Sequence, residues 1–143
     1  MRKRRMLAVT IFCLIGTSIQ ASEEPLSNCF QVDEVLKVVD GDTIDVRVRL
    51  VPFSILNDIR IRMEGINAWE SRTRDPEEKK LGLAAKKRLT ELTQEEVTVC
   101  LTERGKFGRW LGTLFKGDMN INQQLIAEGH AHEYFGGKRK EFK

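Results

Sequence analysis

The fold is decided by residues 35–50, which read VLKVVDGDTIDVRVRL. From Ile44 to Leu50, apolar residues alternate with charged ones, and this period of two predicts a strand with one buried and one wet face. Residues 32–39 read as an earlier, half-buried strand. Asp40 and Gly41 then interrupt the pattern as a tight turn does. The segment therefore predicts two consecutive strands joined by a short turn.

The same alternation resumes further along the chain. Residues 59–64 follow a predicted turn at 52–57 and alternate apolar with charged side chains, which predicts a third strand. Three such strands in succession favour an antiparallel meander. Further extended segments are predicted at 97–101, 110–115 and 130–135.

Two helices are predicted between and after these strands. Asp75 is a favoured N-cap, and Pro76 suits the first helical position. Apolar residues then recur at helical spacing as far as Leu92. A second, short helix begins at Asn120 in a pattern that resembles a capping box, and it ends at Gly129.

The order of these elements is three strands, a helix, two strands and a short helix. Five strands hide their edges by curling into a small barrel, and the OB-fold is the common solution with a helix after the third strand. We therefore predict an α+β protein, a five-stranded antiparallel OB-fold β-barrel with a short second helix. The 143 residues suffice for one such domain. We expect it at 32–135, after an N-terminal segment at 22–31 and before a flexible basic tail at 136–143.

The first 21 residues have the pattern of an export signal. Basic residues at 2–5 precede an apolar run at 6–16, and Ala21 supplies the small residue before a cleavage site. The run is short for a membrane span, which needs roughly 20 apolar residues. We expect a signal peptide at 1–21 and a secreted or periplasmic mature protein without membrane contact, with a retained signal anchor as the alternative.

Removal of this segment changes the charge of the chain. Residues 1–21 hold four of the 24 basic residues and none of the 21 acidic ones, so the remainder carries one net negative charge. A general attraction to polyanions is thereby excluded, and nucleic-acid binding would need a local cationic cluster. The remainder also keeps Cys29 and Cys100, an even pair that predicts a disulfide in an oxidising compartment. The alternative is that the two cysteines are not bonded to each other and pack separately as small apolar residues.

Two clusters of polar residues suggest chemistry at the strand ends. In residues 40–43, two carboxylates two positions apart offer hard oxygen ligands to Ca²⁺ or Mg²⁺, although Asp-Gly is also common in turns. Arg62 is expected on the polar face of the third strand beside Arg60, with Arg47 or Arg49 on the neighbouring strand, where guanidinium groups can hold phosphate. Glu70 lies just past the strand end and can reach over the barrel mouth. The alternatives are that Arg62 is a solvated charge on the strand and that Glu70 is an ordinary acidic residue of the loop.

A third cluster lies at residues 106–110. Gly108 suggests a close approach to a sheet edge, and it places Arg109 at the start of an apolar strand, where a charge must find a partner or face a cleft. A structural salt bridge is the alternative. His130 and His132 are one residue apart, but no third histidine or cysteine lies nearby, so a surface strand is favoured over a metal site.

Together, the three clusters resemble the staphylococcal nuclease (thermonuclease) family in order and spacing, over about residues 32–135. The resemblance implies an OB-type barrel that cuts DNA and RNA endonucleolytically and leaves 3′-phosphates. It implies that Arg62, Glu70 and Arg109 are catalytic. Asp42, Asn67 and the backbone carbonyl of Ala68 would bind one Ca²⁺ ion, with another divalent ion as the alternative. Contacts with the substrate are expected from Arg60, Lys106, Phe107 and Tyr134, in a monomer.

Some residues depart from the family pattern. Asn67 stands where the family has a second calcium aspartate, which predicts weaker calcium binding. Trp69 replaces a usual proline and Phe107 a tyrosine, and the aromatic region near Tyr134 and Phe135 does not align cleanly. We expect an exported calcium-dependent endonuclease. The alternatives are a catalytically weak or inactive OB-fold nucleic-acid-binding module and an exported structural domain.

Overall fold

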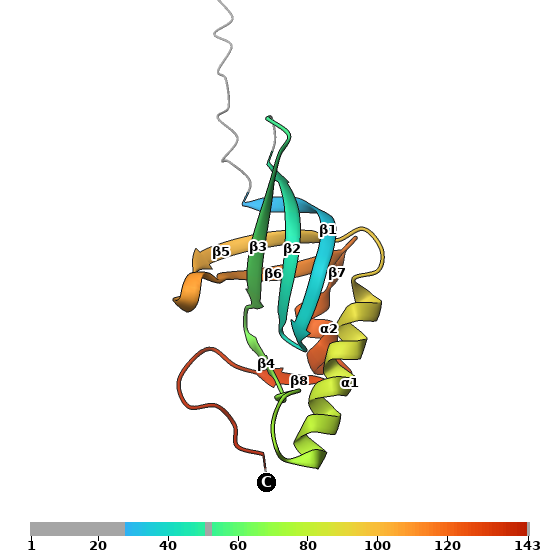
Figure 1. The fold of residues 1–143 in the computed structure, drawn as a ribbon, viewed down its shortest axis with the longest axis vertical. Coiled ribbons are helices and arrows are strands. Elements are labelled where there is room, and N and C mark those ends of the chain that lie inside the picture. Colours follow the sequence, from blue (N-terminus) through green and yellow to red (C-terminus); the bar gives the residue numbers. More distant parts are fainter. Residues whose placement is uncertain (1–27, 51–52, 143) are drawn as a thin grey trace, which may run out of the picture.

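Residues 35–50 form the predicted hairpin. Strand β1 spans Cys29–Asp40 and β2 spans Thr43–Leu50, and they pair antiparallel. The apolar residues of β2 from Ile44 to Val48 are at most 1% exposed, as the alternation predicts. The computed structural model describes residues 28–50 and 53–142 (Figure 1). The predicted signal peptide at 1–21 lies outside the described residues.

Strand β3 (Ile55–Met63) pairs with β2 along its whole length, from Thr43 opposite Arg62 to Leu50 opposite Ile55. It therefore begins four residues earlier than the predicted strand at 59–64, because the ladder continues into the predicted turn. The remaining elements are β4 (Ile66–Ala68), α1 (Pro76–Leu92), β5 (Thr98–Arg104), a 3-10 turn (Lys106–Gly108), β6 (Trp110–Lys116), β7 (Met119–Asn120), α2 (Ile121–Ala127) and β8 (Ala131–Glu133).

Five strands close into a barrel in the order β3-β2-β1-β5-β6, with β6 returning to β3. The predicted α+β OB-type barrel with a helix after the third strand is confirmed. The closing pair, which sets Ile61 opposite Trp110, is parallel, whereas the other barrel pairs are antiparallel. Strands β4 and β8 form a separate small sheet beyond the lower end of the barrel (Figure 1).

Helix α1 lies along the barrel and begins where the sequence predicts (Figure 1). The Asp75 carboxylate accepts hydrogen bonds from the backbone N–H groups of Glu77 and Glu78, at 2.9 and 3.1 Å. A Cβ atom on Gly82 would lie 2.6 Å from the backbone of Glu70, and one on Gly41 would lie 2.5 Å from the Cβ of Ala85. These two glycines therefore let α1 lie directly against the β1–β2 turn and the loop after β4.

Helix α2 is tied to the barrel by a buried amide. Asn122 accepts a hydrogen bond from the Leu114 N–H at 3.1 Å and donates one to the Glu64 carbonyl at 2.9 Å. This amide links α2 to β6 and to the chain just beyond β3. In the described part of the chain, no helix is long and apolar enough to cross a membrane.

A disulfide joins Cys29 on β1 to Cys100 on β5, where the two residues lie directly opposite each other. The bond links positions 71 residues apart. In the chain-entropy model, closing a loop of that length stabilises a fold by about 4 kcal/mol. The barrel is thus fastened covalently at the end remote from β4 and β8 (Figure 1).

Candidate active site

A cavity of about 140 Å³ lies where the β1–β2 turn, the end of β3, the loop after β4 and the C-terminal tail meet. The residues that line it are Asp40, Asp42, Thr43, Arg62, Ala68, Trp69, Glu70, Arg109 and Arg139. The structure thus brings the three candidate catalytic residues, Arg62, Glu70 and Arg109, together with Asp42 and Ala68. Asn67 is not among the lining residues.

Arg62 is the last residue but one of β3 and is only 8% exposed. Its guanidinium donates hydrogen bonds to the carbonyls of Met63 and Ile66, at 3.1 and 2.9 Å, and lies 3.3 Å from the Asp42 carboxylate. Burial lowers the pKa of Arg62, Asp42 opposes this effect, and the positive charges of Arg139 and Arg109 add to it. An arginine stays protonated under such a shift. The site therefore holds a desolvated positive charge near two others, which an anion would stabilise.

Two carboxylates of the β1–β2 turn connect the turn to the loop that carries Glu70. Asp42 accepts hydrogen bonds from the Ala68 N–H at 2.8 Å and from the Thr43 hydroxyl at 2.9 Å. Asp40 accepts one from the Ser71 hydroxyl and another from Arg72 at 3.0 Å. These bonds fix the loop on both sides of Glu70.

Asn67 lies behind Arg62. Its side-chain oxygen accepts a hydrogen bond from the Arg62 guanidinium at 3.0 Å, and its amide nitrogen is 3.5 Å from the His132 ring. Asn67 pairs with His132 across β4 and β8, and this pairing aims its side chain at Arg62. The oxygen proposed from the sequence as a metal ligand is thus already used to orient Arg62. The carboxylates that do line the cavity come from Asp40, Asp42 and Glu70.

Glu70 is paired with a residue that the sequence analysis did not single out. Its half-exposed carboxylate accepts a hydrogen bond from Arg139 at 2.6 Å. Arg139 belongs to the tail at 136–142, which has no helix or strand. The only sequence signal for it is the basic run Lys138-Arg139-Lys140, and nothing in that run indicates a contact 69 residues away.

Arg109 enters the cavity from the residue before β6. Its guanidinium donates to the Lys106 carbonyl at 3.3 Å and lies 5.6 Å from the ring centre of Phe107. Within residues 28–50 and 53–142, Arg109 forms no ion pair, so the alternative of a structural salt bridge is wrong. Gly108 does not approach a sheet edge as expected, because a Cβ there would meet nothing within 4 Å. Its φ of +71° is the reason for glycine at this position.

Residues 60–143 match the family model described as staphylococcal nuclease homologue. The chain belongs to the staphylococcal nuclease family. A micrococcal nuclease from Shigella flexneri is 35% identical over 115 residues, which cover 72% of this chain and 59% of that protein. Protein ParB from Escherichia coli is 29% identical over 110 residues, or 71% of this chain and 56% of its own. The chain thus spans a little over half the length of these curated relatives.

The family match contains Arg62, Glu70, Arg109 and the newly found Arg139, whereas the carboxylate turn at 40–43 lies before its first residue. Two residues expected to contact a nuclease substrate, Lys106 and Tyr134, line a neighbouring cavity of about 540 Å³ with Arg62, Arg109 and Arg139. Phe107 is 90% exposed and does not line either of these two cavities.

The other arginines proposed as phosphate contacts are placed differently. Arg60 donates two hydrogen bonds to Asp45, and Arg47 donates two to Asp58. Arg49 pairs with Asp33. Arg47 and Arg49 lie on the strand next to that of Arg62, as expected, but the register sets Thr43 opposite Arg62, so neither of them lies across from it. Arg60 is also absent from the lining of the cavity, because its guanidinium is held on the outer wall by Asp45.

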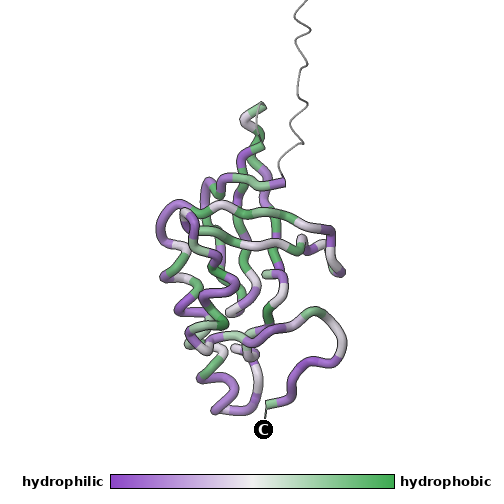
Figure 2. Tube along the Cα trace, turned by 180° about the vertical axis from the view of Figure 1, so that it is seen from behind, coloured by the Kyte–Doolittle hydropathy of each residue, from purple (hydrophilic) through white to green (hydrophobic). Residues whose placement is uncertain are grey.

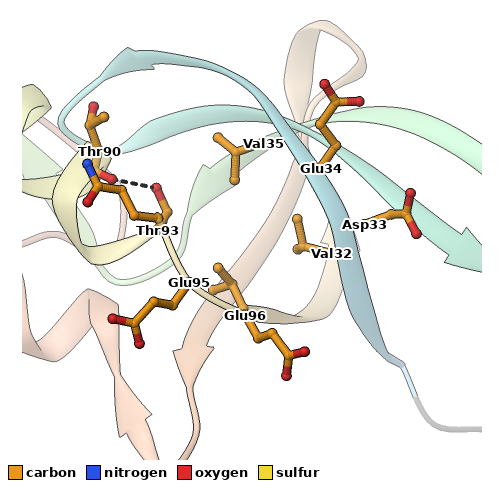
Figure 3. A pocket seen from close by; sticks show the side chains of 10 residues that line it. Val32, Asp33, Glu34, Val35, Thr90, Thr93, Glu95 and Glu96 are labelled. Carbon is orange, nitrogen blue, oxygen red and sulfur yellow. Dashed lines mark hydrogen bonds between the residues drawn. The ribbon is translucent and has the colours of Figure 1, made fainter.

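Another cavity, of about 610 Å³, lies between β1 and the turn from α1 to β5. Figure 3 shows its lining, which includes the carboxylates of Asp33, Glu34, Glu95 and Glu96. Three of these carboxylates, those of Asp33, Glu34 and Glu95, are paired with basic side chains. No basic residue in the described part of the chain lines this cavity, whereas three arginines that can contact a phosphate line the smaller one. Among the described residues, no group of three or more histidine, cysteine or acidic side chains is arranged to hold a metal ion.

Proposed function

We propose that this protein is a nuclease that hydrolyses phosphodiester bonds, with Arg62, Glu70 and Arg109 as its catalytic residues. One observation supports the proposal most directly. These side chains come from β3, the loop after β4 and the residue before β6, and they line one small cavity together with Asp42. A binding module needs cations, but it has no use for a carboxylate in the same cavity as the phosphate.

The geometry suggests how the residues divide the reaction. Phosphodiesters resist hydrolysis because their anionic oxygens repel a nucleophile. Arg62 and Arg109 would bind these oxygens, and more strongly as charge accumulates in the five-coordinate transition state. Arg62 needs little reorganisation, because the oxygens of Met63, Ile66 and Asn67 already orient its guanidinium. Glu70 would orient the attacking water and accept its proton.

The ion pair between Glu70 and Arg139 adds one step to this scheme. The Glu70 carboxylate is occupied by the Arg139 guanidinium at 2.6 Å, and a carboxylate held in this way is not free to bind a water molecule. A phosphate entering the cavity offers Arg139 a second anion. We propose that Arg139 moves toward the phosphate when substrate binds, which frees Glu70 for the water molecule.

A Ca²⁺ ion is the proposed cofactor, with another divalent ion as the alternative. The donors in the cavity are hard oxygens, namely the Asp40 and Asp42 carboxylates, and Ala68, the proposed carbonyl ligand, also lines it. These oxygens are of the type that such an ion prefers, although no group of three acidic side chains is arranged around one point in the described residues and the Asn67 oxygen is used by Arg62. When bound, the ion would neutralise charge on the phosphate. Because few protein ligands are offered, we expect weak binding that is completed by water and substrate.

The setting of the activity is also proposed. The pattern of residues 1–21 supports export, and the mature protein would act on DNA, RNA or both as a monomer in the periplasm or the medium. The name of one relative, micrococcal nuclease, is consistent with a nucleic-acid substrate. The name of the other, Protein ParB, does not specify a substrate.

The test is a degradation assay on residues 22–143 with plasmid DNA and with RNA, with CaCl₂ or with a calcium chelator. We expect cleavage that the chelator abolishes, and a loss of at least about 10²-fold in Glu70→Gln, as for other groups that act in a transition state. Glu96→Gln, which changes an exposed glutamate remote from the cavity, is the matched control and should cleave normally.

The outcomes separate the alternatives. Binding in a gel-shift assay without cleavage would select the OB-fold nucleic-acid-binding module. Neither binding nor cleavage would select a structural domain. Full activity in the presence of the chelator would refute the metal requirement alone. Normal cleavage by folded Glu70→Gln would remove Glu70 from the mechanism.

A further inference from the structure

A second cleft lies beside the catalytic cavity and is not used by the mechanism above. It has a volume of about 600 Å³ and is bounded by Trp69 and the tail residues 138–142. Trp69 and Arg139 line both this cleft and the catalytic cavity, so the two spaces are adjacent. A ligand that occupied the catalytic cavity could therefore extend into the cleft.

Two aromatic rings form a corner of this cleft. The ring centroids of Trp69 and Phe142 are 5.3 Å apart, and their planes meet at 81°. The ring of His132 lies 5.2 Å from that of Trp69 and supports it. Because Trp69 is only half-buried, part of its surface remains open to a flat ligand. Such a corner offers one ring face for stacking and a second ring for edge contact.

The rest of the cleft is mainly cationic. Lys138, Arg139 and Lys140 line it, together with the single acid Glu141. Lys138 is paired with Glu141 at 2.6 Å, and Arg139 with Glu70. No ion pair of Lys140 occurs among the described residues. Figure 2 shows this segment as a hydrophilic stretch that loops beside the small β4–β8 sheet. Aromatic rings next to a basic segment are the combination that binds unpaired nucleotides.

We infer that this cleft is a subsite for an unpaired nucleotide adjacent to the scissile phosphate, with the base stacked on Trp69, the ring of Phe142 in edge contact with the base, and its phosphate near Lys140. The inference rests on the proposed function and deepens it. A base within a duplex has both faces covered by its neighbours, so only an unpaired or extruded base can enter the corner. Tyr134 and Phe135 line a different cavity and are not part of this cleft.

The experiment measures binding without cleavage. Fluorescein-labelled single-stranded (dT)₄ and (rU)₄ are titrated by anisotropy against residues 22–143 in the presence of EDTA. The sequence has two tryptophans, so Trp110→Phe leaves Trp69 as the sole reporter of tryptophan emission. We expect unlabelled (dT)₄ or (rU)₄ to quench that emission saturably, and an abasic tetramer with the same phosphates to leave it unchanged.

Substitutions then test the two parts of the subsite. Trp69→Leu and Phe142→Leu should each weaken binding of the tetramer about tenfold, because each removes an aromatic ring that contacts the base. Lys140→Gln should weaken it less, and the difference should disappear at high salt. Phe53→Leu and Lys87→Gln are the matched controls. Both change exposed side chains away from the cleft and should bind as the wild type does.

The inference is overturned if Trp69 emission ignores both tetramers, or if folded Phe142→Leu and Trp69→Leu bind them as tightly as the wild type. The emission experiment uses Trp110→Phe, in which Trp69 is unchanged. It therefore tests the subsite even if Trp69→Leu does not fold. The result is independent of the degradation assay. A protein that cleaves without quenching loses only the subsite, whereas one that shows base-dependent quenching without cleavage loses only the nuclease proposal.

Discussion

Arg60 and Arg62 lie two residues apart on β3, yet their surroundings are opposite. Arg60 donates hydrogen bonds of 2.6 and 2.7 Å to the Asp45 carboxylate, and this bond raises its pKa. Arg62 is buried, its pKa is lowered chiefly by that burial, and its hydrogen bonds go to neutral oxygens, with the Asp42 carboxylate 3.3 Å away. Asp45 holds Arg60 by two hydrogen bonds, whereas Arg62 makes one longer ion pair and faces the positive charges of Arg109 and Arg139, so Arg62 keeps more capacity to bind an anion.

Closure of the barrel causes this difference. The parallel contact between β3 and β6 begins at Ile61, so Arg62 lies inside the closed part and Arg60 just before it. On the outer wall Asp45 lies across from Arg60 and Asp58 across from Arg47, and Arg49 is paired with Asp33 of β1. A solvated pair of this kind contributes little to stability, and it occupies the guanidinium that a phosphate would need. Buried arginines that are not held by two hydrogen bonds to a carboxylate are therefore better candidates for phosphate binding than arginines that are merely close in sequence.

The largest expected effect is at the buried arginine. Arg62→Ala should lower turnover by at least about 10²-fold, because a group that binds the transition state is removed. Arg109→Ala should act in the same way. The rate constant of cleavage is measured with a labelled oligonucleotide under single-turnover conditions, and circular dichroism verifies that the variant is folded. A folded Arg62→Ala with nearly wild-type turnover would invalidate the comparison.

An intermediate effect is expected at Arg139, which shares the cavity but is half-exposed and paired with Glu70. Arg139→Ala should raise KM about tenfold and change kcat by less than about threefold, because a contact to substrate is lost while the catalytic groups remain. Steady-state kinetics separate the two constants. A selective fall in kcat would instead assign Arg139 to the transition state, and no change in KM would deny it contact with the substrate.

The smallest effect is expected at the outer wall. Arg60→Ala should keep kcat/KM within about twofold of the wild type, because Arg60 is held by Asp45 and does not line the cavity. The same oligonucleotide assay at low and moderate salt provides the measurement. A large loss at both salt concentrations would restore Arg60 as a contact to substrate and weaken the distinction between paired and unpaired arginines.

The sequence was informative wherever a local pattern sets the structure. The alternation in residues 44–50 predicts β2 and its buried face, and Asp75 marks the start of α1 through its own hydrogen bonds. The family pattern predicted the group Arg62, Glu70 and Arg109, and the structure places these residues in one cavity.

Apart from the Cys29–Cys100 disulfide, contacts between distant segments were not predictable in this way. Arg139 reaches Glu70 across 69 positions, from a tail whose composition suggests only solvation. The role of Asn67 depends on the pairing of two three-residue strands, which are too short to leave a periodic signal. The parallel closing pair depends on how β6 returns to β3, and strand alternation is the same in either direction.

Helix α1 acts as a spacer for the cavity, since Gly41 and Gly82 let its backbone touch both the acidic turn and the Glu70 loop. The separation of those two segments is therefore fixed by a helix that is not part of the barrel. A fluctuation that moved α1 alone would separate Asp42 from Glu70 while the sheet stayed closed and the disulfide intact. On heating, we expect the proposed nuclease activity to be lost some degrees below the unfolding temperature of the barrel, with α1 as the first element to detach.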